Sequence, residues 1–262
     1  MSRYLLGVMA LGLLVGRADA KLHTETVAYK DGDAVLEGYL VWDDGGAAKK
    51  PAVLVVHDWM GISDDTRKRA DMLARLGYVA FAADIYGKGA QPKDAAAAGA
   101  LAGKWKKDRA ALRKRAKAAL DLVAANPHVD AQRLGAIGFC FGGTTVLELA
   151  RSGAPLVATV SFHGGLDTPN PADARNIKGH ILALHGADDP HVPAAEVSGF
   201  AKEMREAKVD WQIIAYGGAV HAFTVVAAGN DVSKGAAYDE RADHRSWLAM
   251  QQFFTETFAA RK

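Results

Sequence analysis

The 262-residue chain contains a single cysteine, so no internal disulfide can form. An unpaired cysteine in an oxidising compartment invites mixed disulfides and oxidation, and its presence there needs an explanation. One interpretation is a buried, inert thiol, because free cysteine packs as a small hydrophobic residue. The other is a reactive thiol. The residues that surround Cys140 in the sequence decide between the two.

The chain also lacks a strong charge imbalance, since its formal net charge is only +2. Nothing in that balance requires a nucleic-acid or membrane partner. Residues 104–117 are rich in lysine and arginine, but Trp105 is their only aromatic residue. This stretch falls on a predicted helix with an apolar stripe, so a solvated helix face explains it better than a nucleic-acid patch.

The first twenty residues differ in kind from the rest. Arg3 supplies a positive start, residues 4–16 are apolar and uncharged, and residues 18–20 read Ala-Asp-Ala. This pattern predicts a secretory signal peptide over residues 1–20, with cleavage after the last alanine. The alternative is a retained anchor, but the apolar run is short for a membrane span. We therefore expect a secreted protein, periplasmic if its source is a bacterium, with a mature chain of residues 21–262.

The mature chain has no internal repeat and no linker, which predicts one domain over residues 21–262. Strand-like segments cover residues 22–30, 34–42, 52–56, 78–83, 133–138, 156–162, 180–185 and 211–216. Helical segments cover residues 64–76, 94–125 with breaks around Gly99 and Gly103, 144–151, 194–207 and 235–258. After an N-terminal hairpin, this alternation predicts a mostly parallel sheet with helices on both faces. Reactive loops in such sheets follow the C-terminal ends of the strands.

One such loop carries the cysteine. Residues 138–143 read Gly-Phe-Cys-Phe-Gly-Gly between a predicted strand and a predicted helix. This is the nucleophile-elbow pattern, Gly-x-nucleophile-x-Gly, and no Gly-x-Ser-x-Gly competes with it elsewhere. The helix N-terminus would favour a thiolate on Cys140, and the N–H of Phe141 would face a developing oxyanion. The alternative is a plain tight turn with a buried thiol.

A thiol nucleophile needs a base, and two later loops supply candidates in the chain order nucleophile, acid, histidine. His221 lies in a loop that follows one predicted strand and is the predicted base. Asp189 follows the preceding strand and would orient the imidazole, with Asp188 as the second choice. The alternatives are a structural histidine and aspartates that only shape a turn.

A metal centre is a competing interpretation of the same region, because four potential ligands crowd within seven positions. These are His185, Asp188, Asp189 and His191. The chain has no His-x-x-x-His helix pair and no cysteine-based metal motif. We therefore expect no metal and no cofactor.

These motifs resemble those of the dienelactone hydrolase family, and the resemblance covers nearly all of the mature chain. Its most specific parts are the Gly-x-Cys-x-Gly-Gly elbow, the Asp189-x-x-Val-Pro segment and the Gly-x-x-His221-x-Phe segment. The resemblance implies an α/β-hydrolase fold and a Cys140–His221–Asp189 triad. It further implies a small-molecule ester or lactone as substrate, and a core of this length can stand as a monomer.

The resemblance also assigns candidate roles around the triad. Where the family often has His-Glu-x-x-Gly, this chain has Asp58 in place of the thiol-activating glutamate, one methylene shorter. The same match makes the N–H of Trp59 the second oxyanion donor beside Phe141. Tyr86 and Lys88 lie in a stretch that resembles the family's substrate-binding region. Lys88 is the nearest equivalent of an arginine that holds the substrate carboxylate, although lysine is a point charge rather than a bidentate fork.

The sequence thus predicts a carboxylic ester hydrolase that works through a thioester on its cysteine. Two other classes stay open. One is a broad carboxylesterase or a thioesterase on the same scaffold, because a fold does not fix a function. The other is a secreted binding protein that kept the fold and lost turnover, which the replacement of glutamate by aspartate favours.

Overall fold

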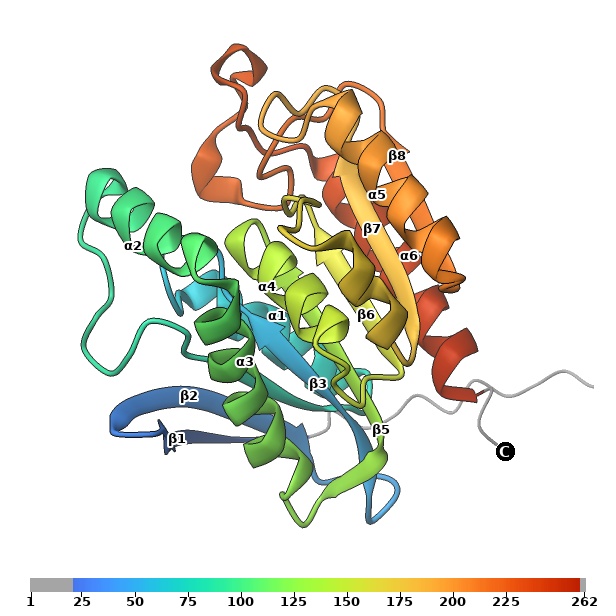
Figure 1. The fold of residues 1–262 in the computed structure, drawn as a ribbon. Coiled ribbons are helices and arrows are strands. Elements are labelled where there is room, and N and C mark those ends of the chain that lie inside the picture. Colours follow the sequence, from blue (N-terminus) through green and yellow to red (C-terminus); the bar gives the residue numbers. More distant parts are fainter. Residues whose placement is uncertain (1–20, 260–262) are drawn as a thin grey trace, which may run out of the picture.

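The computed structural model describes residues 21–259, so the predicted signal peptide lies outside the described residues. One eight-stranded sheet forms the centre, in the order β1-β2-β4-β3-β5-β6-β7-β8 (Figure 1). Its strands are β1 (Leu22–Asp31), β2 (Ala34–Asp43), β3 (Lys50–Val56), β4 (Val79–Ala83), β5 (Val129–Phe139), β6 (Ala158–Phe162), β7 (His180–Gly186) and β8 (Trp211–Tyr216). The β1–β2 hairpin and the β2–β4 pair are antiparallel, and all other pairs are parallel. This confirms the predicted hairpin and the mostly parallel sheet.

Helices cover both faces of the sheet, with α3, α4 and α5 on one side and α1 and α6 on the other (Figure 1). The helices are α1 (Asp64–Arg75), α2 (Ala95–Lys107), α3 (Arg109–Ala124), α4 (Phe141–Arg151), α5 (Ala194–Ala207) and α6 (Glu240–Ala259). Residues 21–259 also contain three short 3₁₀ turns: η1 (Pro171–Asn176), η2 (Val226–Ala228) and η3 (Val232–Lys234). None of the helices within residues 21–259 combines the length and the apolarity that a membrane crossing requires.

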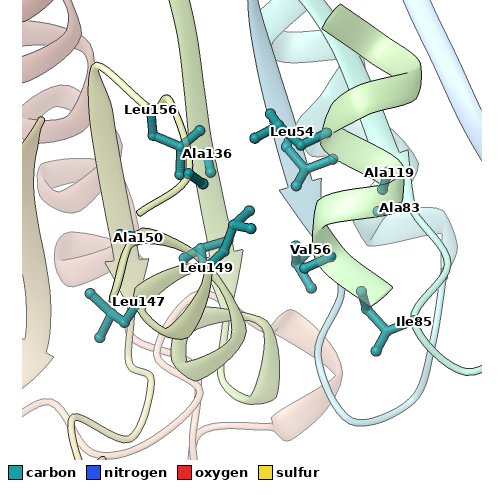
Figure 2. Packing of buried hydrophobic residues seen from close by; sticks show 14 of the residues in the cluster. Leu54, Val56, Ala83, Ile85, Ala119, Ala136, Leu147, Leu149, Ala150 and Leu156 are labelled. Carbon is teal, nitrogen blue, oxygen red and sulfur yellow. The ribbon is translucent and has the colours of Figure 1, made fainter. Parts of the chain in front are cut away.

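The central strand β3 shows how the sheet supports two cores at once. Leu54 and Val56 point to the side of α3 and α4, where they pack in the cluster of Figure 2. Val53 and Val55 alternate to the opposite face, toward α1. All four are fully buried, and each side chain contributes roughly 1.5–3 kcal/mol relative to exposure. The rigid strands fix the positions of the loops at their C-terminal ends.

The prediction that the 94–125 helix breaks at Gly99 and Gly103 is wrong. Both glycines lie inside α2, and the chain breaks at Asp108. Asp108 leaves the helical region, and its carboxylate accepts the N–H of Ala111 at 2.9 Å, which caps α3. A glycine weakens a helix by only about 1 kcal/mol, whereas a good N-cap can begin a new helix.

Three predicted element starts also move by three residues or more. Strand β5 begins at Val129 rather than at residue 133, and α4 begins at Phe141 rather than at residue 144. The last helix begins at Glu240 rather than at residue 235. Residues 235–239 are not helical. The N–H of His221 donates to the carbonyl of Gly235, and the carbonyl of His221 accepts the N–H of Ala237. Apolar periodicity does not reveal such a backbone bridge.

Candidate active site

Cys140 occupies the turn between β5 and α4 in a strained backbone conformation, with φ 52° and ψ −113°. The glycines on either side make this turn possible. A Cβ at Gly138 would lie 2.0 Å from the carbonyl oxygen of Gly142, and a Cβ at Gly142 would lie 2.2 Å from that of Val56. Any side chain at either position would force the backbone apart. The Gly-x-Cys-x-Gly pattern therefore builds the elbow that the sequence predicts.

The elbow places Cys140 at the N-cap of α4, whose residues are all buried. The first N–H groups of a helix have no acceptor within the helix, and the helix dipole is positive at this end. Phe141 is the first residue of α4, so its N–H is such an unsatisfied donor. Both effects favour negative charge beside Phe141, on the sulfur or on an oxygen bound next to it.

His221 and Asp189 reach the cysteine from two other loops and form one line with it. The Nε2 atom of His221 lies 3.0 Å from Sγ of Cys140. Its Nδ1 atom lies 2.8 Å from Oδ2 of Asp189. The second carboxylate oxygen of Asp189 accepts the N–H of His191 at 2.8 Å, which fixes its orientation. The structure thus brings together the three residues predicted as a triad.

Charge complementarity within this line raises the pKa of His221. Burial of the ring opposes the charged form, but hydrogen bonds to Asp189 and Cys140 outweigh it and raise the pKa to about 10. Burial likewise works against the charge on Asp189, yet the bond from His221 leaves the pKa of this carboxyl below its usual range. These contacts therefore favour the charged form of the imidazole, which lies between the carboxylate and the sulfur.

Asp188, the second choice for the acid, has a different hydrogen-bond partner from Asp189. Its side chain is exposed, and its carboxylate accepts the N–H of Gly218 at 3.1 Å. Asp189 is buried and bonded to His221. The geometry therefore favours Asp189 over its neighbour.

Three further histidines end strands near the same edge, and all three have lowered pKa values because burial disfavours their charged forms. These are His57, His163 and His185. The ring of His57 is fixed in place, since Nδ1 donates to the carbonyl of Asp58 at 2.6 Å and Nε2 accepts the N–H of Ile85 at 3.3 Å. Burial and lowered pKa values fit a packing or supporting role for these three rings rather than the role of the base.

Asp58 and Trp59 lie on the loop after β3, across from the elbow. The Asp58 carboxylate accepts the N–H of Met60 at 2.8 Å. Burial raises the pKa of Asp58, and the charge on His221 acts in the opposite sense, so this carboxyl lies within electrostatic range of the triad. Trp59 is 39% exposed, an unusual exposure for tryptophan. The roles suggested for both residues stay predictions.

Tyr86 and Lys88 have different surroundings. The Tyr86 ring packs against His57 and Phe141, with centroids 4.7 and 5.4 Å apart, and its hydroxyl donates to the carbonyl of Trp59. Burial, then the nearby charges of Asp58 and Cys140, raise the pKa of Tyr86. Lys88 instead pairs with Glu37 of β2 at 2.7 Å and is half exposed. Of the two predicted substrate contacts, Tyr86 is the one packed against the elbow.

The sequence analysis did not predict a role for Thr224 or Arg69, although both belong to the contacts that surround His163. Thr224 is fully buried, and its hydroxyl contacts His163. Arg69, on α1, donates to the carbonyl of Thr224. Neither residue lies in a motif, so the sequence carries no signal for them. Within residues 21–259, no three histidine, cysteine or acidic side chains are grouped so that they could hold a metal ion.

An eight-stranded, mostly parallel sheet with a nucleophile elbow, and with an acid and a histidine on later loops, defines an α/β-hydrolase. The model of the dienelactone hydrolase family matches residues 36–258. The chain belongs to the dienelactone hydrolase family and is a hydrolase of that type.

Solved structures and curated relatives agree with this placement. The protein called m3DLH is 45% identical, with a TM-score of 0.87, over 90% of this chain and 99% of that one. A dienelactone hydrolase-like promiscuous phosphotriesterase from metagenomic libraries is also 45% identical, with a TM-score of 0.86, over 90% and 98%. The carboxymethylenebutenolidase homolog of Homo sapiens is 30% identical over 66% of this chain and 70% of that protein.

Proposed function

We propose that this protein hydrolyses an ester or lactone bond with Cys140 as nucleophile, His221 as general base and acid, and Asp189 as the residue that orients the imidazole. The observation that carries the proposal is the line of contacts from Asp189 through His221 to the sulfur, with distances of 2.8 and 3.0 Å. A cationic imidazole beside a cysteine at a helix N-terminus favours a thiolate.

The reaction then has two halves. The thiolate attacks the carbonyl carbon, and the N–H groups of Phe141 and Trp59 hold the oxyanion. The carbon–oxygen bond breaks, the alcohol leaves with the proton from Nε2 of His221, and a thioester remains on Cys140. His221 next takes a proton from water, and the hydroxide attacks the thioester. The carbon–sulfur bond breaks, the thiolate returns, and the acid product releases its proton to solvent and leaves as a carboxylate.

Asp58 and Tyr86 complete the proposed site. Asp58 acts with His221 to promote the thiolate, and its burial and raised pKa support a part as proton acceptor. Tyr86 lines the substrate side of the elbow, next to Phe141. The ion pair of Lys88 with Glu37 argues against Lys88 as an anchor for a substrate carboxylate. The proposed substrate class is therefore small esters and lactones without an obligatory carboxylate.

Hydrolysis of short p-nitrophenyl esters and of a dienelactone by the protein and by Cys140→Ala tests the proposal. We expect the variant to lose at least about a thousandfold in kcat, because the nucleophile is gone. Cys140→Ser is the matched control, since it keeps a nucleophilic side chain of similar size with oxygen in place of sulfur. Turnover that survives in Cys140→Ala would overturn the triad. If the unmodified protein hydrolyses none of the esters or lactones, the binding-protein alternative is favoured.

A second candidate function is phosphotriester hydrolysis. It is favoured by the 45% identity to a protein described as a promiscuous phosphotriesterase. Here the thiolate would displace the alcohol group from phosphorus, and water would then release the dialkyl phosphate. Diethyl p-nitrophenyl phosphate, assayed beside the esters, tests this function. A Cys140→Ala variant that loses both activities together would assign them to one site.

We also propose that residues 1–20 direct export, that the mature chain begins at Lys21 and that it is a monomer. The pattern of a positive start, an apolar run and Ala-Asp-Ala supports export. Expression of the full chain in a bacterium, followed by fractionation and N-terminal sequencing, tests export. A product that keeps Met1 in the cytoplasm would contradict it. Light scattering on the purified mature chain tests the oligomeric state.

A further inference from the structure

A buried histidine contacts the backbone of Cys140 without taking part in the proposed chemistry. His163 follows β6 and is 1% exposed. Its Nδ1 atom lies 3.1 Å from the backbone nitrogen of Cys140. The same N–H also faces the carbonyl of Phe162 at 3.0 Å, so two acceptors share it. This N–H is therefore engaged at the base of the elbow, whereas the N–H of Phe141 remains for an oxyanion.

The contacts of His163 fix which ring nitrogen carries the proton. A backbone N–H can only donate, so Nδ1 of His163 must accept. The proton then resides on Nε2, which donates to Oγ1 of Thr224 at 2.7 Å. Burial, then the charge on His221, lower the pKa of His163 well below its ordinary value, so the ring stays neutral. With both nitrogens engaged, His163 has no free lone pair to accept a proton from the sulfur.

Thr224, the partner of His163, is itself held from α1. Arg69 donates to the Thr224 carbonyl at 2.9 Å and to the Asp243 carboxylate of α6 at 2.9 Å. The Arg69 guanidinium also lies over the Trp247 ring, 5.5 Å from its centroid. A continuous set of buried and partly buried polar contacts thus runs from α1 and α6 through Thr224 and His163 to the nucleophile.

The elbow and the neighbouring loop after β6 need such support because each contains a residue with a strained backbone. Cys140 has φ 52° and His163 has φ 39°, a region that side-chain-bearing residues rarely adopt. Strained conformations persist only where the surroundings hold them. The His163 ring also packs edge-on against the His221 ring, with centroids 5.3 Å apart. One side chain therefore touches both the nucleophile's backbone and the ring of its base.

We propose that His163 is a positioning residue for the hydrolysis. Through Nδ1 it holds the Cys140 backbone in the orientation that aims Sγ at His221, and Thr224 holds His163 in the tautomer that this requires. This inference rests on the proposed function, because it assigns His163 a part in positioning the same nucleophile. His163 contacts the backbone of Cys140, not the reacting atoms.

Two matched pairs of variants test it. His163→Asn keeps an acceptor oxygen near the place of Nδ1 and tolerates a positive φ, whereas His163→Leu removes the acceptor. Thr224→Ser keeps the hydroxyl, whereas Thr224→Val keeps the shape without it. We expect His163→Leu to lower kcat about 10- to 100-fold with KM changed less than about twofold, since a misplaced nucleophile loses rate more than binding. His163→Asn and Thr224→Ser should stay within about threefold of the unmodified protein, and Thr224→Val should fall between.

Thermal unfolding of each variant separates positioning from folding. Full kcat in both His163→Leu and Thr224→Val would overturn the inference, as would equal losses in the two members of each pair. If His163→Leu fails to fold, the Thr224 pair decides alone. If the unmodified protein hydrolyses nothing, the proposed function fails. The alkylation rate of Cys140 by iodoacetamide at pH 7 then decides the inference separately. If alkylation slows in His163→Leu and Thr224→Val but not in His163→Asn and Thr224→Ser, positioning is supported. Equal rates in all four variants overturn it.

Discussion

Asp188 and Asp189 are adjacent in the chain, but their carboxylates have different partners. Asp189 is buried and bonded to His221, and Asp188 is exposed and accepts the N–H of Gly218. Only the buried carboxylate can stabilise the imidazolium and fix its tautomer. The two residues therefore form a natural pair for a controlled comparison.

We expect Asp189→Asn to lower kcat for p-nitrophenyl ester hydrolysis by about 10²–10⁴-fold, because a neutral amide neither stabilises the charged ring nor enforces its tautomer. Asp188→Asn should stay within about threefold, because its carboxylate does not contact the ring. Steady-state kinetics of both variants check the prediction. Equal losses in the two would mean that the acid is assigned wrongly.

The raised pKa of His221 also makes stability depend on pH. The folded value of about 10 lies above the ordinary value of 6.5, so the folded state holds this proton more tightly than the unfolded state. The stabilisation from the charged ring is fully present below pH 6.5 and is lost as the pH rises toward 10. Urea unfolding measures the free energy of unfolding of the unmodified protein and of His221→Gln. The stability advantage of the unmodified protein should shrink as the pH rises across this window. An advantage that grows with pH would contradict the assigned protonation.

Among the helices, the α2–α3 junction separates two signals that the sequence alone confuses. Gly103 lies inside α2, where a Cβ would meet no atom within 4 Å. Asp108 begins α3 by capping it. The glycine is thus a local weakness without a structural task, and the aspartate is the true boundary.

We expect Gly103→Ala to raise the free energy of unfolding by about 0.5–1 kcal/mol, because alanine loses less backbone entropy in a helix. Asp108→Ala should lower it by about 1 kcal/mol through loss of the cap. Urea denaturation of the two variants measures both changes. A loss of stability in Gly103→Ala would show that this position needs glycine for a reason that its open surroundings do not reveal.

For the whole molecule, the parts of the fold that follow from local patterns were predictable. The order of strands and helices follows from hydrophobic periodicity, and Cys140, Asp189 and His221 meet because parallel strands end at one edge. The contacts of Thr224 with His163 and of Lys88 with Glu37 were not predictable. Such pairs join side chains far apart in sequence, and no spacing rule encodes them.

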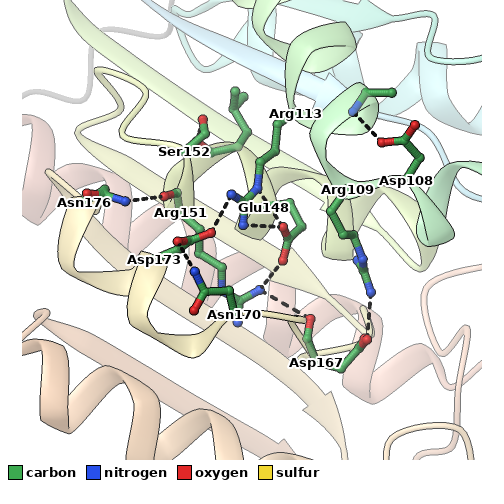
Figure 3. A network of polar contacts seen from close by, with 12 residues as sticks. Asp108, Arg109, Arg113, Glu148, Arg151, Ser152, Asp167, Asn170, Asp173 and Asn176 are labelled. Carbon is green, nitrogen blue, oxygen red and sulfur yellow. Dashed lines mark hydrogen bonds and ion pairs between the residues drawn. The ribbon is translucent and has the colours of Figure 1, made fainter.

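A further unpredicted feature is a buried ionic network beside α4 (Figure 3). Arg151, 1% exposed, binds Glu203 of α5 through two hydrogen bonds of 2.8 Å and Glu148 of α4 at 3.0 Å. Glu148 also accepts from Arg113 of α3, which in turn pairs with Asp173 of η1 at 2.6 Å. The network therefore joins α3, α5 and η1 to α4, the helix that carries the elbow at its N-terminus.

We expect Arg151→Met to lower the free energy of unfolding by about 3–5 kcal/mol, because it leaves the buried carboxylate of Glu203 without its partner. Lys117→Met is the matched control. Its exposed pair with Asp121, at 2.7 Å, should contribute less than about 1 kcal/mol. Adding Glu203→Leu to Arg151→Met should restore part of the loss, since it removes the stranded charge while Glu148 keeps Arg113. A double variant less stable than Arg151→Met would mean that this network stabilises the fold through packing rather than through charge pairing. The second substitution would then have removed further contacts instead of removing an unpaired carboxylate.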